Sequence, residues 1–172
     1  MGRDRELATL DGELAALGSG GSCAIAITGE AGIGKSRLLA ALTAAADERG
    51  HTVLAARATE LERHRPLGVV VDALDDYLAA LPADELDPLG PARLAELGRL
   101  FPALAPVQPI GGTGRHGAHH AVRSLLELLA ARRPLVLALD DLHWADDAAL
   151  ELVSYLLRRP PRAPVLLALA FR

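Results

Sequence analysis

The segment GEAGIGKS at residues 29–36 combines residue types that can bind phosphate. It matches the pattern G-x-x-x-x-G-K-[ST] at every fixed position, with an apolar run before it and an apolar-striped segment after it. The glycines let backbone N–H groups turn inward around phosphate oxygens, and a helix beginning near Lys35 adds its positive end. Lys35 is expected to reach the β- and γ-phosphates of a nucleotide, and the Ser36 hydroxyl to bind Mg²⁺. The predicted nucleotide-binding residues of this loop are Gly29, Glu30, Ala31, Gly32, Ile33, Gly34, Lys35, Ser36 and Arg37.

A second feature is a pair of adjacent carboxylates, Asp140 and Asp141, directly after the apolar run LVLAL at residues 135–139. Taken alone, such a pair fits a strand that simply ends in solvent. A phosphate loop needs a metal, however, and the metal needs an acid at the end of a nearby strand. We therefore expect Asp140 to hold Mg²⁺ through water, opposite Ser36. Asp141 is expected to polarise the attacking water as a base, or alternatively only to order water.

Apolar runs and helical periodicity alternate along the chain and predict the elements that position these residues. We expect strands at residues 23–28, 52–59, 135–139 and 165–171. Helices are expected at about 3–17, from the phosphate loop to about 49, and at about 67–78, 91–101, 119–132 and 147–159, the last capped by Asp146. Strands that alternate with helices indicate a parallel sheet, and continuous apolar strands indicate a sheet covered on both faces. The prediction is an α/β P-loop NTPase fold with three layers, α/β/α, around a mostly parallel sheet of about four strands.

Residues 81–117 differ from the rest in composition, since most of the 11 prolines and the glycine-rich segment at 110–114 fall there. We expect a flexible insert that contains one short helix near 91–101, otherwise loop, with disorder around 108–117. The whole chain, residues 1–172, is predicted to be a single P-loop module.

The composition excludes several classes of function. The net charge is −4 and aromatic residues make up 3% of the chain, so neither a basic nucleic-acid surface nor a base-stacking platform is expected. The single cysteine, Cys23, lies in an apolar run, which indicates a small core residue in a reducing, cytoplasmic environment. No stretch approaches the roughly 20 apolar residues of a membrane span, so no membrane association is predicted.

Several other residues allow two interpretations. His116, His119 and His120 lie close together, but a solvated helix start fits them better than a zinc site, because too few further ligands are near in sequence. Trp144 is expected to pack, whereas His143 either packs beside it or lies near the phosphates.

Four segments resemble, in this order, the ATPase module of LuxR-type transcriptional regulators of the large ATP-binding class, a branch of the AAA-like signal-transduction ATPases. They are GRDREL at 2–7, GEAGIGKSRLL at 29–39, LVLALDDLHWAD at 135–146 and VLLALAFR at 165–172. The resemblance implies a Walker A role for Lys35 and Ser36 and a Walker B role for Asp140 and Asp141. It also places Gly2 and Arg3 near the adenine and Arg172 in contact with the γ-phosphate, which completes the predicted catalytic set of Asp141, Lys35 and Arg172.

In such proteins ADP holds a closed form, ATP with an inducer favours an open, assembling form, and a distant helix-turn-helix binds DNA. The family's sheet has a fifth strand beside the phosphate-loop strand, followed by a helical lid. Neither is recognisable in this sequence, so we expect a truncated module whose phosphate-loop strand is an exposed edge. The expected partners are a nucleotide and further domains or subunits of a larger regulator.

Three functions remain open at the level of sequence. The first is an ATP/ADP-dependent regulatory switch with weak ATPase activity and Mg²⁺ as its metal. The second is a turnover ATPase, for which an arginine finger worth about 10³–10⁵ in rate is expected and none is evident. The third is a small-molecule kinase, whose acceptor pocket and cationic lid would have to come from residues 81–117.

Overall fold

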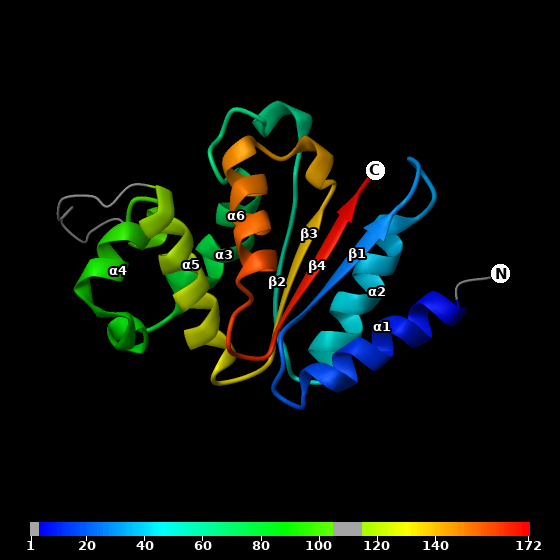
Figure 1. Ribbon diagram of the computed structural model, residues 1–172, viewed down its shortest axis with the longest axis horizontal. Helices are drawn as coiled ribbons and strands as arrows, with labels where there is room; N and C mark the ends of the chain where they lie inside the picture. The colour runs from blue at the N-terminus through cyan, green and yellow to red at the C-terminus, as the bar shows by residue number, and fades with distance from the viewer. Residues whose placement is uncertain (1–3, 105–114) are drawn as a thin grey trace.

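The computed structural model describes residues 4–104 and 115–172 (Figure 1). Its centre is a sheet of four parallel strands: β1 (Cys23–Thr28), β2 (Thr52–Arg57), β3 (Leu135–Asp140) and β4 (Val165–Phe171). Their order is β1-β4-β3-β2. The prediction of a parallel sheet is confirmed, and so is the prediction that the phosphate-loop strand, β1, lies at an edge.

The two central strands are buried on both faces, because their side chains alternate between two hydrophobic clusters. In β3, Leu135, Leu137 and Leu139 pack into one cluster, and Val136 and Ala138 pack into the other. β4 alternates in the same way. This is the arrangement that continuous apolar runs predict for a parallel sheet covered by helices.

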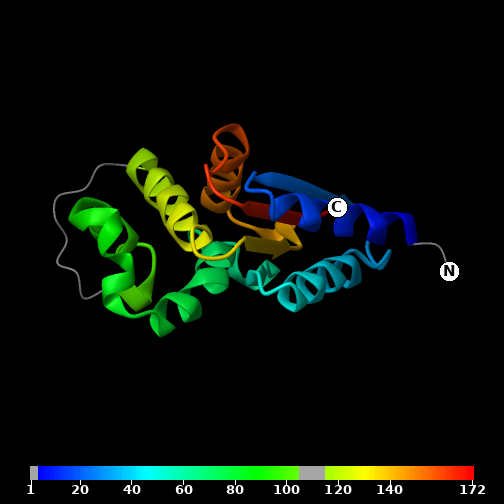
Figure 2. The same ribbon diagram turned by 90° about the horizontal axis from the view of Figure 1, so that it is seen from below.

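Helices cover both faces of the sheet and complete the predicted three layers. On one face lie α1 (Asp4–Leu17) and α2 (Lys35–Glu48), and on the other lie α3 (Gly68–Ala80), α5 (Arg115–Ala130) and α6 (Asp147–Arg158). Figure 2 shows α6 and α2 on opposite sides of the strands. The structure therefore has the P-loop NTPase fold. None of the described helices is long and apolar enough to cross a membrane.

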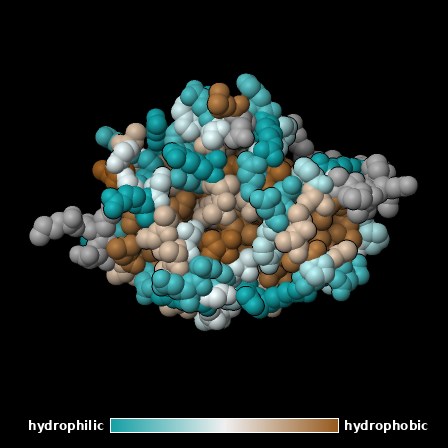
Figure 3. Space-filling model, turned by 180° about the vertical axis from the view of Figure 1, so that it is seen from behind, coloured by the Kyte–Doolittle hydropathy of each residue, from teal (hydrophilic) through white to brown (hydrophobic). Residues whose placement is uncertain are grey.

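The exposed edge leaves β1 less covered than its neighbours. Ala24, Ala26 and Thr28 are exposed on it, whereas every residue of β3 is buried. Seen from the face opposite to Figure 1, apolar side chains reach the surface in several patches separated by hydrophilic ones (Figure 3).

Residues 81–104 are largely helical, so the prediction of loop outside the helix at 91–101 is wrong for residues 83–89 and 102–104. They form η2 (Ala83–Leu89), α4 (Gly90–Leu97) and η3 (Pro102–Leu104). Leu86, Leu97 and Phe101 are buried against the core, so apolar side chains between the prolines provide the burial that a disordered loop lacks. The helix predicted at 91–101 runs from 90 to 97, and the one predicted at 119–132 runs from 115 to 130. Of the segment expected to be disordered, 108–114 lie outside the described residues.

Asp146 ties the beginnings of two helices together. As the predicted N-cap of α6, its Oδ1 accepts hydrogen bonds from the backbone N–H groups of Ala148 (2.9 Å) and Ala149 (3.1 Å). The same oxygen accepts from the N–H of Leu67 (3.1 Å), which precedes α3 in a left-handed conformation with φ 58°. One carboxylate therefore satisfies donors from two segments that are distant in sequence.

We expect Asp146→Ala to lower the free energy of unfolding by about 2 kcal/mol, because it removes a cap and leaves partly buried N–H groups without an acceptor. Asp147→Ala is the matched control, since this exposed neighbour only contributes charge near the start of α6 and is expected to cost about 0.5 kcal/mol. Urea denaturation followed by circular dichroism measures both. Equal losses in the two variants would show that the three hydrogen bonds contribute nothing beyond charge.

Candidate functional site

The carboxyl ends of the strands bring the predicted site residues to one edge of the sheet. In register, Thr28 of β1 lies beside Phe171 of β4, and Leu139 of β3 lies beside Leu169 of β4. β4 separates β1 from β3, and neighbouring strands lie about 4.8 Å apart, so the phosphate-loop strand and the acid-bearing strand are about 10 Å apart. Ligands of open α/β sheets bind at this edge.

The phosphate loop connects β1 to α2 in a conformation that requires glycine. Gly29 has φ 151°, and a Cβ atom placed there would lie 3.0 Å from Cγ2 of Ile33. Gly34 has φ 92° and occupies the N-cap of α2, whose free N–H groups carry the positive end of the helix dipole. The loop thus has the geometry that the glycine spacing predicts, a backbone concavity at a helix N-terminus.

Lys35 supplies a buried positive charge at this loop. Its side chain is buried, and Nζ donates hydrogen bonds to the carbonyl oxygens of Gly29 (2.8 Å) and Glu30 (2.9 Å). Within the described residues the ammonium pairs with these neutral acceptors and with no carboxylate. Its charge is therefore available to an anion in the loop, which is the fit expected of a phosphate site.

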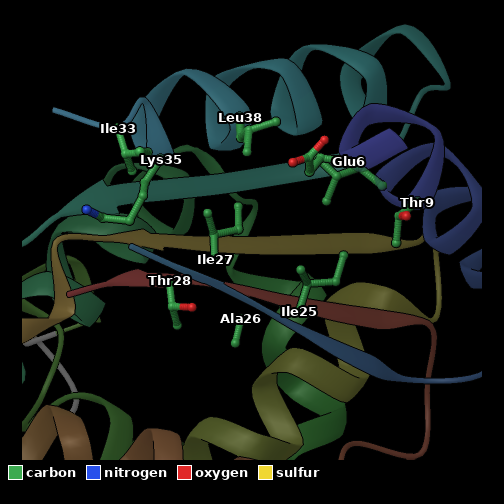
Figure 4. Close-up of a pocket in the computed structure, with 10 residues that line it drawn as sticks. Glu6, Thr9, Ile25, Ala26, Ile27, Thr28, Ile33, Lys35 and Leu38 are labelled. Atoms are coloured by element: carbon green, nitrogen blue, oxygen red, sulfur yellow. The ribbon is translucent and has the colours of Figure 1, made fainter. Parts of the chain in front are cut away.

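A groove of about 350 Å³ leads away from Lys35 along β1 (Figure 4). Its floor includes Ile25 and Ile27 of β1, which point toward α2, and α1 contributes Glu6 and Thr9 to its far end. Its volume falls in the range of about 300–1,000 Å³ that small-molecule sites occupy.

Asp140 provides the buried acid on the opposite side of β4. It is the last residue of β3, it is 7% exposed, and its Oδ1 accepts a hydrogen bond from the N–H of Asp141 at 2.8 Å. β3 thus includes Asp140, one residue beyond the predicted strand, and β2 ends at Arg57, two residues before its predicted end. A buried carboxylate at the same edge of the sheet as a phosphate loop is the type of donor that Mg²⁺ prefers.

The comparison with protein families agrees with this geometry. The sequence model of the AAA ATPase domain matches residues 1–168. This chain belongs to the AAA ATPase domain family. Among curated proteins, no sequence matches it.

Arg57 is a residue of this AAA ATPase domain that sequence reasoning missed. It is paired in register with Asp140 on the adjacent strand, and its Nε lies 4.0 Å from Oδ2 of that carboxylate. The only signal in the sequence is a charged residue that ends the apolar run TVLAA at 52–56. Arg57 reaches the two aspartates only because the strand order places β2 beside β3 rather than beside β1.

Asp141 is engaged in an ion pair rather than free at the site. Its Oδ2 accepts hydrogen bonds from Nε (2.8 Å) and Nη2 (2.5 Å) of Arg57, and these bonds raise the pKa of the Arg57 guanidinium. Its Oδ1 lies 3.9 Å from Nδ1 of His143, and neither ring nitrogen of that histidine has a hydrogen-bond partner among the described residues. The role of Asp141 as a base stays a prediction.

Trp144 is surrounded by cations and by a second aromatic ring. The guanidinium carbon of Arg63 lies 5.5 Å from the indole centroid, and that of Arg172 lies 5.9 Å from it. The ring of His143 lies 5.0 Å away, and Trp144 itself packs against the core, as expected. Arg172 directly follows β4, the strand between β1 and β3, and its guanidinium lies over Trp144.

The structure describes some of the remaining predicted site residues and not others. Ser36 and Arg37 are exposed in the first turn of α2, whereas Gly2 and Arg3 lie outside the described residues. In the described part of the chain, no group of three or more His, Cys, Asp or Glu residues could hold a metal. The metal-binding role of Ser36 and Asp140 stays a prediction.

Cys23 behaves as the predicted small core residue rather than as a reactive group. It is half-buried at the start of β1, and burial, with a contribution from the charge of Glu13, raises the pKa of its thiol to about 11. Such a thiol is a poor nucleophile near neutral pH.

Proposed function

We propose that this AAA ATPase domain is an ATP- and ADP-binding switch that hydrolyses ATP slowly with Mg²⁺. The observation that carries the proposal is the position of Lys35. Lys35 is buried at a loop whose backbone conformation requires glycine. One strand separates it from the buried carboxylate of Asp140. A loop that binds phosphate and an acid that binds the associated metal are the two halves of a P-loop nucleotide site.

The loop would hold the β- and γ-phosphates through its backbone N–H groups and Lys35, whose bonds to Gly29 and Glu30 can be exchanged for phosphate oxygens. Arg37, which is exposed in the first turn of α2, stays a predicted contact of the nucleotide. The groove along β1 suits the flat faces of the adenine ring, because it begins at Lys35 and is lined by isoleucines. Gly2 and Arg3 stay predicted contacts of the adenine.

Ser36 and Asp140 would hold Mg²⁺, Ser36 through its hydroxyl and Asp140 through water. When bound, the ion supplies charge that neutralises the phosphates during transfer. Arg172 would contact the γ-phosphate from the end of β4, after leaving its stack on Trp144. Loss of the γ-phosphate would then release Arg172, which gives the domain two nucleotide-dependent states.

Two observations support a switch over the alternatives. Asp141 is paired with Arg57, which suits slow hydrolysis rather than rapid turnover. A small-molecule kinase needs an acceptor pocket over the phosphates, but α4 packs against α5, away from the sheet (Figure 1), and η3 packs against α3.

The resemblance to LuxR-type regulators supports a place for this domain in a larger cytoplasmic signalling protein. Other domains or subunits would be its partners, and another part of that protein would bind DNA. The acidic net charge of −4 fits a segment that does not contact DNA itself.

Lys35→Ala should weaken ATP affinity about 10- to 100-fold while the fold is retained, because a charged hydrogen-bond donor to phosphate is lost. Calorimetric titration measures the affinity, and circular dichroism verifies the fold. Arg49→Ala, at the far end of α2, is the control and should bind ATP normally. Unchanged affinity in Lys35→Ala would refute the phosphate site.

Asp140→Asn should weaken ATP binding in the presence of Mg²⁺ by about 10- to 100-fold, as expected for a residue that holds a metal through water. In excess EDTA the same variant should bind ATP nearly as well as the unmodified domain. Titrations under the two conditions separate a role in metal binding from a role in binding ATP itself. Equal losses of ATP affinity in both conditions would show that Asp140 does not hold the metal.

A switch should retain its product. We expect the freshly purified domain, once denatured, to release close to stoichiometric ADP, identified by chromatography, and to show few turnovers in steady-state phosphate release. Rapid multiple turnovers in water would favour a turnover ATPase, and release that depends on an added acceptor would favour a kinase.

A further inference from the structure

The groove along β1 carries opposite charges at its two ends. In the part of the chain that the structure describes, ten residues line it, and Glu6 and Lys35 are the only charged ones among them. Lys35 lies at the phosphate loop, whereas the Glu6 side chain extends from α1 toward Leu38 of α2 near the other end (Figure 4). A triphosphate is attracted to the cation and repelled by the carboxylate, so these charges determine which way round a nucleotide would lie.

The middle of the groove is apolar and suits a flat ring. Ile25 and Ile27 project from β1 toward α2, and Leu38 lies across from them. Residues 25–28 of β1 line the groove, which at about 3.3 Å per residue corresponds to about 10 Å of strand. With its phosphates at Lys35, a nucleotide would place its base over the isoleucines, with the edge of the base toward α1.

The end formed by α1 offers hydrogen-bond acceptors rather than donors. The lining residues that α1 contributes are Glu6, Thr9 and Leu10. A carboxylate such as that of Glu6 only accepts hydrogen bonds. The Thr9 hydroxyl donates its proton to the carbonyl oxygen of Arg5 at 3.0 Å, so its oxygen is left to accept. Glu6 and Thr9 are three residues apart, which puts both acceptors on one face of the helix.

An end of this kind can pair with adenine in one way. Adenine has a single donor group, the amino group at position 6, and its ring nitrogens are acceptors. The two N–H bonds of the amino group match the two acceptors, one for Glu6 and one for Thr9. Any other edge of adenine would bring ring nitrogens against the carboxylate, where both sides lose water and neither gains a hydrogen bond.

We propose that Glu6 and Thr9 hold the base of a bound nucleotide by accepting hydrogen bonds from the 6-amino group of adenine. This role rests on the proposed function, and it gives α1 a part in recognising the base. Glu6 contributes the larger share, because an ionised acceptor forms the stronger hydrogen bond. Both residues act on binding and not on phosphate transfer, since they lie at the opposite end of the groove from Lys35.

The test measures by calorimetry the affinity of the domain for Mg-ATP and for the Mg complex of purine riboside triphosphate, which lacks the 6-amino group. We expect the unmodified domain to bind ATP about 10-fold more tightly, as one or two hydrogen bonds would provide. In Glu6→Ala the ATP affinity should fall about 5- to 10-fold, while the affinity for purine riboside triphosphate stays unchanged. Thr9→Val should lower the ratio of the two affinities about two- to three-fold.

Glu48→Ala is the matched control, because it removes an exposed carboxylate at the end of α2 that does not line the groove. It should leave both affinities unchanged. Glu6→Gln keeps an acceptor oxygen without the charge, and its affinity ratio should lie between those of the unmodified domain and Glu6→Ala. Circular dichroism verifies that each variant is folded.

The role of Glu6 and Thr9 is overturned if the unmodified domain binds both nucleotides equally well, or if Glu6→Ala loses the same affinity for both. It is also overturned if Glu48→Ala lowers the ratio as much as Glu6→Ala does. Tighter binding of GTP than of ATP would overturn it too, because the carboxylate would then accept from N1–H and the 2-amino group of guanine. Failure of the unmodified domain to bind ATP would instead refute the proposed function.

Discussion

The burial of β3 and β4 on both faces is the constraint on which the rest of the structure depends. Every residue of β3 is enclosed between two hydrophobic clusters, so the strand cannot shift without exposing leucines on one side. Asp140 is the first polar residue that this strand reaches, and it arrives at the edge while still buried. The apolar sequence of the strand therefore sets the position of a charged group.

The same constraint determines the distance across the site. Because β4 is paired on one side with β1 and on the other with β3, the phosphate loop and Asp140 face each other over a single intervening strand. A triphosphate with its metal can span this gap, whereas adjacent strands would leave the two groups in contact. The strand order thus sets the distance between the two motifs, which the motifs themselves do not determine.

A second set of contacts connects the site to the helical layers. Asp146 links the starts of α3 and α6, and Trp144 lies between them and the end of β4, where Arg172 stacks on it. Arg57 joins β2 to the residue that follows β3. Changes at the proposed nucleotide site could therefore reach the helices on the α6 side through these short connections, which is a physical basis for the proposed switch.

Much of this arrangement follows from local sequence. Gly29 and Gly34 determine the loop, because only glycine tolerates its backbone conformation, and the alternating runs determine a parallel sheet. Asp146 is recognisable as a cap from its position before acidic and apolar residues. The insert is more helical than its proline content predicts, because proline content describes the backbone locally and not the burial of Leu97 and Phe101 against distant helices.

By itself, the sequence determined the phosphate loop, the acid-bearing strand and the fold class, because these depend on residue type and on spacing along the chain. Only the tertiary structure decided that Arg57 donates hydrogen bonds to the carboxylate of Asp141. It also decided that two arginines lie over the indole ring of Trp144. Those contacts join strands and loops that are far apart in the sequence. They depend on sheet order and register, which are fixed by the packing of the whole core and leave no local signal.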